Sequence, residues 1–133
     1  MCIRDRAKID IDIAIENCKN IGSKDIGQAC VVVNGQIIAS EDSSGTDKML
    51  RGIISKEIRF HNEGVLVKLA KPIQDRRVDL PAIGMQTIKL AKEIGICGIA
   101  IEDNSSFISN KEGVIEFANK NNIFIFGLSN EKL

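Results

Sequence analysis

The sequence predicts a single layered α/β domain in which helices flank a mixed β-sheet. The chain has 133 residues, of which 44% are hydrophobic, so it can bury one core but is too short for two ordinary domains. Short apolar runs alternate with segments of helical periodicity in the order helix, hairpin, helix, strand, helix, strand, helix, strand. The hairpin predicts an antiparallel start to the sheet, and the later strand-helix-strand units predict parallel neighbours.

Residues 1–6, which read MCIRDR, share no periodicity with the residues after them and resemble adapter-derived remnants at the ends of metagenomic reading frames. We therefore expect the domain to comprise residues 7–133, as the carboxyl-terminal piece of a longer protein. The first predicted element is a helix over Ala7–Asn20, although the isoleucines between positions 9 and 15 also alternate as in a strand. Gly22 and Ser23 should end it.

Two apolar runs at 29–33 and 36–39 flank Asn34-Gly35, the dipeptide most typical of a tight hairpin. The next polar stretch leads into a helix for which Ser44 or Thr46 could provide the cap. The apolar face of this helix comprises Met49, Leu50, Ile53 and Ile54. A further strand is expected over 65–69.

A helix is predicted over 85–94 with Gly95 as its stop, followed by a buried strand at 98–101. Asn110 can cap a last helix, and 123–126 forms a last apolar strand. The inward face of that helix is expected to be Val114, Phe117 and Ala118. Core positions, rather than a base-stacking platform, are expected for Phe107, Phe117, Phe124 and Phe126.

Composition excludes several classes of function. Lys plus Arg and Asp plus Glu both number 18, so no nucleic-acid surface or polybasic membrane anchor is indicated. No apolar run spans a bilayer and no signal peptide is visible, so we expect a cytoplasmic protein. His61 is the single histidine, and the four cysteines form no CxxC pair, which argues against a zinc site or a redox pair. The cysteines are expected to be buried or incidental thiols.

The segment at 67–84, VKLAKPIQDRRVDLPAIG, is the strongest candidate for chemistry. A strand would deliver Lys68 and Lys71 to its end, and Pro72 would then interrupt regular structure. The charged and polar residues beyond it are Gln74, Asp75, Arg76, Arg77 and Asp79. Arginine grips phosphate through two N–H groups, lysine acts as a mobile charge, and aspartate oxygens suit Mg²⁺. The combination is typical of a site that cleaves a phosphoric anhydride.

The spacing of Asp75 and Asp79 leaves two arrangements open. In a strand they would stand about 13 Å apart, at roughly 3.3 Å per residue, whereas in a bend they would approach to about 5 to 6 Å. Only the bent chain lets both bind one ion; otherwise one binds the metal and the other orients an arginine. The alternative is that the charged residues between Asp75 and Asp79 only form surface ion pairs, which have little energetic value and no function.

A second polar cluster follows the hairpin. Glu41 precedes Gly45-Thr46-Asp47, where a strand end leads into a helix and backbone N–H groups with a hydroxyl can meet an anion. The competing interpretation is a simple helix cap. The glycine fingerprint of dinucleotide-binding folds, GxGxxG, is absent.

Four segments, DIGQACVVVNGQIIASED, SGTDKML, GVLVKLAKPIQDRRVDLPAIGMQTI and GICGIAIE, occur in this order. Together they resemble the carboxyl-terminal domain of the UDP-2,3-diacylglucosamine pyrophosphatase family of lipid A biosynthesis, over nearly all of Ala7–Phe126. The resemblance implies Mg²⁺-dependent hydrolysis of UDP-2,3-diacylglucosamine to 2,3-diacylglucosamine 1-phosphate (lipid X) and UMP. It also implies a cytoplasmic protein that associates peripherally with the inner membrane, where its lipid substrate lies.

Residue roles follow from the same resemblance. Asp75 would be the essential metal-associated carboxylate, with Asp79 as its companion. The pyrophosphate would be met by Gln74, Lys71 and Arg76, and Thr46 with Asp47 would complete the site. The chemistry of the residues adds Lys68, Arg77 and Gly45 as further candidates for binding the substrate. Where related sequences typically read EGTD, this chain has Ser44. The lost carboxylate could weaken a contact with metal or water, or Glu41 or Asp42 could replace it. The amino-terminal domain of the family is missing, so the fragment alone should show little or no activity.

Two other functions stay open at this point. The charged segment could belong to a non-enzymatic nucleotide- or phosphate-binding module, in which Asp75 and Asp79 only orient the arginines. It could also be an interface loop. The sequence leaves open whether the protein forms a homodimer.

Overall fold

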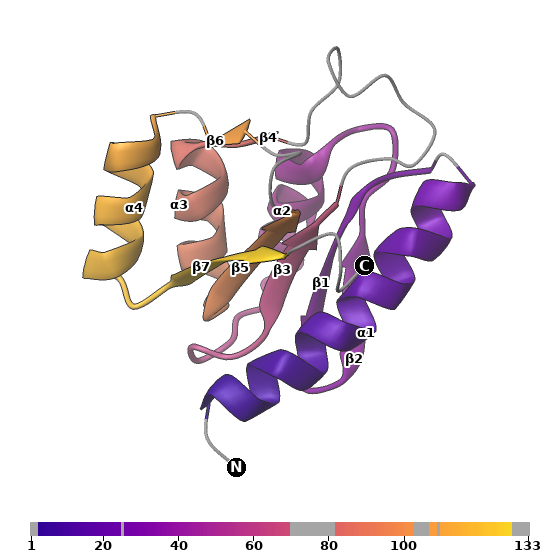
Figure 1. The fold of residues 1–133 in the computed structure, drawn as a ribbon, viewed down its shortest axis with the longest axis horizontal. Coiled ribbons are helices and arrows are strands. Elements are labelled where there is room, and N and C mark those ends of the chain that lie inside the picture. Colours follow the sequence, from indigo (N-terminus) through magenta and orange to yellow (C-terminus); the bar gives the residue numbers. More distant parts are fainter. Residues whose placement is uncertain (1–2, 25, 70–81, 103–106, 109, 129–133) are drawn as a thin grey trace.

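The computed structural model describes residues 3–24, 26–69, 82–102, 107–108 and 110–128. They form an α/β domain whose main sheet has five strands in the order β2-β1-β3-β5-β7 (Figure 1). The helices are α1 (Ile3–Ser23), α2 (Thr46–Ser55), α3 (Met85–Ile94) and α4 (Lys111–Lys120). The strands are β1 (Ala29–Val33), β2 (Gln36–Ser40), β3 (Val65–Lys68), β4 (Ala82–Ile83), β5 (Gly98–Glu102), β6 (Phe107–Ile108) and β7 (Phe124–Leu128).

The predicted fold class and order of elements are confirmed, with one addition. The short strands β4 and β6 pair in parallel as a separate two-stranded sheet that the sequence did not indicate. Each has two residues, which is too short for a visible hydrophobic pattern. The α1 helix starts at Ile3, within the six residues left out of the expected domain.

The five-stranded sheet is mixed, as predicted. Strand β1 pairs antiparallel with β2 and β3, and β5 pairs in parallel with β3 and β7. In this register Lys68 lies beside Ala29 on one side and Ile101 on the other. The start of β1 therefore lies at the same edge of the sheet as the ends of β3 and β5.

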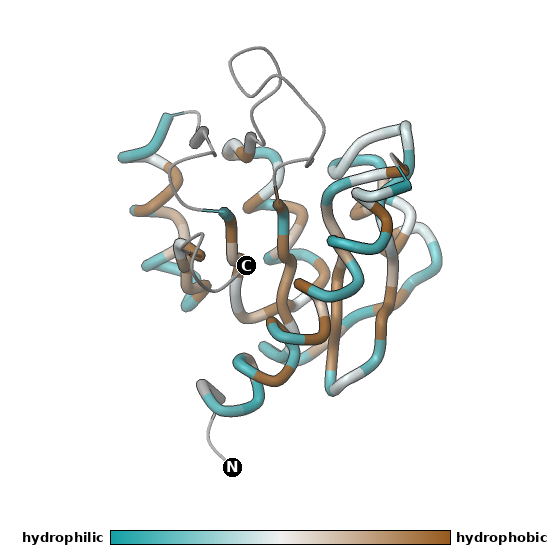
Figure 2. The backbone as a smooth tube through the Cα atoms, turned by 45° about the vertical axis from the view of Figure 1, so that its right-hand side comes forward, coloured by the Kyte–Doolittle hydropathy of each residue, from teal (hydrophilic) through white to brown (hydrophobic). Residues whose placement is uncertain are grey.

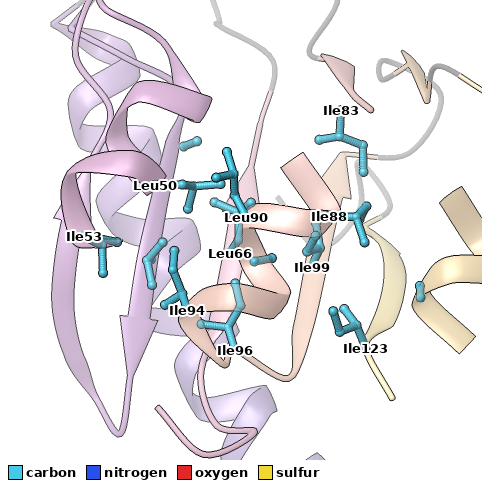
Figure 3. Packing of buried hydrophobic residues seen from close by; sticks show 14 of the residues in the cluster. Leu50, Ile53, Leu66, Ile83, Ile88, Leu90, Ile94, Ile96, Ile99 and Ile123 are labelled. Atoms are coloured by element: carbon cyan, nitrogen blue, oxygen red, sulfur yellow. The ribbon is translucent and has the colours of Figure 1, made fainter. Parts of the chain in front are cut away.

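Helices cover both faces of the sheet. Figure 1 shows α1 on one face and α2, α3 and α4 on the other. The α1 face buries Ala14 and Cys18 against Val65 and Val67, and the opposite face contains the larger core. Figure 3 shows Leu50, Ile88, Leu66 and Ile99, among others, packed in this larger core. In Figure 2 the hydrophobic colour follows the strands and alternates with the hydrophilic colour along the helices, as helical amphipathicity requires.

The first helix is fixed to the hairpin by a buried carboxylate. Asp10 is 2% exposed and accepts hydrogen bonds from the N–H groups of Asn34, at 3.2 Å, and Gly35, at 2.8 Å. Ile9, next to it, is 46% exposed, so the alternation of isoleucines does not reflect a strand. The helical interpretation of this segment is confirmed.

Helix ends agree with prediction only in part. The expected break of the first helix at Gly22 and Ser23 is wrong, because α1 continues through both residues. Gly95 ends α3 in the left-handed conformation, with φ 94°, as expected. The prediction that Ser44 or Thr46 caps α2 is wrong, because Gly45 occupies the N-cap position and has no side chain to offer. Asn110 does occupy the N-cap of α4, but it makes no side-chain cap hydrogen bond.

The cysteines of the described chain are free and buried, as predicted for Cys18, Cys30 and Cys97. No pattern in the sequence indicated that the Sγ atoms of Cys18 and Cys30 lie 3.4 Å apart, between α1 and β1. The hydrogen bond that the Cys18 thiol shares with Cys30 raises the pKa of Cys18, and burial raises it further. Burial likewise raises the pKa of Cys97, whose Sγ donates to the carbonyl of Gly64 at 3.1 Å. Neutral thiols of this kind are packing residues.

The phenylalanines are only partly core residues. Phe117 and Phe124 are half-buried against the two cores. Phe126 is 42% exposed, so its predicted burial is wrong. It lies on the edge strand β7, whereas α1 packs mainly over β1 and β3. The prediction for the Phe107 side chain falls outside the part of the chain whose side chains are described.

Candidate active site

An open cavity of about 790 Å³ lies where the end of β3 meets the starts of α2 and α3. Its lining comprises Ser44, Gly45, Thr46, Asp47, Lys48, Arg51, Lys68, Ile83, Gly84 and Thr87. The structure therefore brings Lys68 from the charged segment together with the Gly45-Thr46-Asp47 turn, two parts of the sequence that lie more than 20 residues apart.

The remaining predicted site residues lie outside the described part of the chain. They are Lys71, Gln74, Asp75, Arg76, Arg77 and Asp79. The described residues near either end of this segment, Lys68 and Ile83, both line the cavity. The two arrangements considered for Asp75 and Asp79 stay predictions.

The start of α2 is built around a glycine. Gly45 has φ 98°, a backbone conformation that residues with a Cβ rarely adopt. Because Gly45 has no side chain, the first N–H groups of α2 receive no side-chain cap from it. These groups and the helix dipole give this end of α2 a partial positive charge, which favours an anion.

Two hydrogen bonds hold the first residues of α2. The Thr46 hydroxyl donates to Oε2 of Glu41 at 3.2 Å. The Thr87 hydroxyl, from the first turn of α3, donates to Oδ1 of Asp47 at 2.8 Å. The side chains that line this wall of the cavity are therefore held from both sides.

Positive charge dominates the described lining. Lys48, Arg51 and Lys68 are cationic, and Asp47 is the single carboxylate among the described lining residues. Lys68 is only 7% exposed and lies at the end of β3. A buried lysine at the end of a strand, facing a cavity with two further cations, suits an anionic ligand.

The described residues do not form a complete metal site by themselves. Among them, no group of three or more His, Cys, Asp or Glu side chains could hold a metal ion. Asp47 supplies one hard oxygen ligand at the cavity, which is the donor chemistry that Mg²⁺ accepts. A magnesium site here would need further carboxylates, and Asp75 and Asp79 are the candidates.

Thr87, Lys48 and Arg51 were not predicted. Lys48 and Arg51 lie one turn apart on α2, a spacing that is equally typical of a solvated helix face. Thr87 is a polar residue whose burial, at 5% exposed, becomes apparent only in the structure. Its partner Asp47 lies 40 residues earlier, so no local pattern could have linked the two.

The resemblance leads to the expectation that Glu41 or Asp42 replaces a carboxylate missing at Ser44, but the cavity lining does not support this expectation. The Ser44 N–H donates to Oδ1 of Asp42 at 2.8 Å, and this hydrogen bond holds the pKa of Asp42 below its usual range. Glu41 accepts a hydrogen bond from Thr46. Neither carboxylate is among the described residues that line the cavity.

Comparison with known proteins agrees with the resemblance seen in the sequence. The chain is 42% identical over 124 residues to the UDP-2,3-diacylglucosamine pyrophosphatase LpxI of Caulobacter vibrioides (strain ATCC 19089 / CIP 103742 / CB 15). The alignment covers 90% of this chain and 44% of that protein, so the chain spans less than half the length of this relative. The family model of the LpxI C-terminal domain matches residues 3–126, from α1 into β7. The chain belongs to the LpxI C-terminal domain family.

Proposed function

We propose that this chain is the carboxyl-terminal part of a UDP-2,3-diacylglucosamine pyrophosphatase, which hydrolyses its substrate to lipid X and UMP. The observation that carries this proposal is the convergence of Lys68 and the start of α2 on one cationic cavity. The name of the Caulobacter relative supports the substrate, and the cationic lining suits a pyrophosphate.

The residues around the cavity would bind and orient the pyrophosphate. Lys48, Arg51 and Lys68 can neutralise its oxygens, together with the N–H groups at the start of α2. Positively charged groups that are preorganised around the reacting phosphate stabilise the additional negative charge of the transition state. Gln74, Lys71, Arg76 and Arg77 are proposed to add contacts from the segment between Lys68 and Ile83.

The reaction is proposed to depend on Mg²⁺. Asp75 and Asp79 would hold the ion, with Asp47 as a further oxygen at the cavity wall. When bound, the ion would supply neutralisation of the phosphate oxygens beyond what the lysines and arginine provide. The contact with Thr87 fixes Asp47 in place for this role.

The cellular location follows from the proposed substrate. Within the described residues, no helix has both the length and the apolar character needed to cross a membrane. The acyl chains of the substrate would bring the protein to the cytoplasmic surface of the inner membrane, where it is proposed to associate peripherally. The uridine, sugar and acyl chains are large. We propose that the other wall of their pocket is formed by the part of the full-length protein that corresponds to the unaligned part of the relative.

The test is a chimeric enzyme in which residues 7–126 replace the matching part of the Caulobacter relative. We expect it to release UMP from UDP-2,3-diacylglucosamine in the presence of Mg²⁺, and the chain alone to release little or none. Chelation with EDTA should abolish the release, and added Mg²⁺ should restore it, because the lysines and arginines alone do not neutralise the charge that develops on the phosphate oxygens. Chromatography of the nucleotide product measures the rate.

Three outcomes would change the proposal. A folded chimeric enzyme that releases no UMP would contradict the hydrolase function. If it nevertheless binds inorganic pyrophosphate, the non-enzymatic phosphate-binding module becomes the better description. If the Asp75→Ala variant still releases UMP, the proposed role of Asp75 is wrong, but the proposed reaction stands.

A further inference from the structure

A buried carboxylate lies behind the cavity without lining it. We propose that Glu41 is a positioning residue of this site, acting through the Thr46 hydroxyl to set the start of α2 against the end of β3. The inference rests on the proposed function, because it assigns the residue that gives the phosphate-binding wall its shape. Glu41 is 7% exposed, and its Oε2 accepts hydrogen bonds from the Thr46 hydroxyl, at 3.2 Å, and the Gln28 N–H, at 3.4 Å.

The backbone of Glu41 is a fixed point in the fold. Its N–H donates to the carbonyl of Ala29 at 2.8 Å, directly after β2. A Cβ atom on Gly27 would stand 2.2 Å from the Glu41 carbonyl oxygen, so the two chains are packed as closely as a glycine permits. The carboxylate therefore projects from backbone that is hydrogen-bonded and closely packed.

At the start of α2, the Gly45 N–H donates to the Asp42 carbonyl at 3.2 Å, and two side-chain hydrogen bonds add to this backbone contact. Among the described residues, a Cβ atom on the N-cap residue Gly45 would meet nothing within 4 Å, and this residue contributes no side-chain cap. The contacts of Thr46 with Glu41 and of Asp47 with Thr87 position this end of the helix without occupying its first N–H groups. Loss of the Glu41 carboxylate would deprive a buried hydroxyl of its acceptor and release one of the two tethers.

Glu41 also connects the two sides of the cavity. The Gln28 carbonyl accepts the N–H of Leu69 at 2.8 Å, next to Lys68 at the end of β3. The N–H of the same Gln28 donates to Glu41, which holds Thr46. A short path of hydrogen bonds thus runs from the backbone beside Lys68 to the first residue of α2.

Two substitutions separate the effect of side-chain length from the effect of charge. Glu41→Gln keeps an oxygen at the same distance from the backbone, so it can still accept from Thr46 and Gln28. Glu41→Asp keeps the charge but withdraws it by one methylene. We expect Glu41→Asp and Glu41→Ala to lower kcat/KM of the chimeric enzyme about 10- to 100-fold, because small displacements at a binding site have effects of this size. Glu41→Gln should stay within about threefold, since a neutral acceptor keeps the hydrogen bonds.

A second readout does not depend on turnover. We expect the affinity of the isolated chain for inorganic pyrophosphate, measured by calorimetry, to fall about tenfold in Glu41→Asp and to be rescued in Glu41→Gln. Amide shifts of Thr46 and Asp47 should move in Glu41→Asp before any ligand is added. Glu116→Ala serves as the control, because this glutamate is exposed on α4 and pairs with Lys120 in a surface contact.

The outcomes separate the positioning role from the proposed function. If wild type is active and a folded Glu41→Asp or Glu41→Ala variant is equally active, the positioning role is overturned and the proposed function stands. A Glu41→Gln variant that is as impaired as Glu41→Ala would also overturn the positioning role, because the negative charge rather than the length of the side chain would then be required. If wild type neither hydrolyses the substrate nor binds pyrophosphate, the proposed function itself fails. Thermal melts establish which variants are folded.

Discussion

Replacing Lys68 by methionine is expected to lower kcat/KM of the chimeric enzyme about 100- to 1,000-fold, the usual cost of removing one charge-stabilising donor from a reaction site. Lys68 is 7% exposed at the end of β3 and lines the cavity that also contains Lys48 and Arg51. A buried charge loses less of its field to solvent than an exposed one. The affinity of the isolated chain for pyrophosphate should fall about 10- to 100-fold for the same reason.

Two further variants make the Lys68 result specific. Lys68→Arg retains the positive charge and should recover part of the affinity, although the guanidinium group is larger and fits phosphate differently. Lys92→Met removes an exposed lysine from α3 and should change neither quantity. If Lys68→Met is folded and binds pyrophosphate as well as wild type, the cavity is not the site of phosphate recognition.

Gly95→Ala is expected to lower the free energy of unfolding by about 3 to 5 kcal/mol, since a left-handed alanine and a steric overlap each contribute. Gly95 has φ 94°, and a Cβ atom placed on it would stand 1.9 Å from the carbonyl oxygen of Phe60. That carbonyl cannot move away easily, because the Phe60 N–H donates to the Ile94 carbonyl at 2.7 Å. Denaturant-induced unfolding of the isolated chain measures the effect.

Gly52→Ala provides the matched control. Gly52 lies inside α2, and a Cβ atom there would meet nothing within 4 Å among the described residues. Alanine is favoured over glycine in a helix, so this variant should be more stable than wild type by about 0.5 to 1 kcal/mol. A loss of less than about 1 kcal/mol in Gly95→Ala would contradict the close packing of the Phe60 backbone against the end of α3.

The fold was predictable where local signals and the tertiary structure agree. Helix α3 occupies the predicted range Met85–Ile94 because its apolar period is followed by Gly95, which adopts the left-handed conformation that ends helices. The hairpin turn has positive φ at both Asn34 and Gly35, as its sequence indicates. Asp10 could not be assigned in the same way, because its burial depends on N–H groups 24 and 25 residues away.

The site was predictable in part. The Gly45-Thr46-Asp47 turn and Lys68 were each recognisable as anion-binding candidates, and the structure places both at one cavity. The use of the Thr46 hydroxyl was not predictable, since the same residue types could have formed an ordinary helix cap. It donates to Glu41 because the chain folds back between β2 and α2, a geometry set by Gly45 and by packing at Gly27. Pairing of Thr87 with Asp47 likewise depends on contact between α2 and α3.

The cavity is assembled from the end of β3 and the starts of α2 and α3, so its walls separate when the chain unfolds. A molecule that occupies it must bind the native state alone and shift the unfolding equilibrium by mass action. At a concentration about 100 times its dissociation constant, such a ligand adds about 2.7 kcal/mol to the free energy of unfolding. The melting temperature of this chain is therefore a sensor of occupancy that needs no catalytic turnover. A panel of uridine nucleotides, sugar phosphates and pyrophosphate, ranked by melting temperature, would reveal which portion of a substrate this domain recognises unaided.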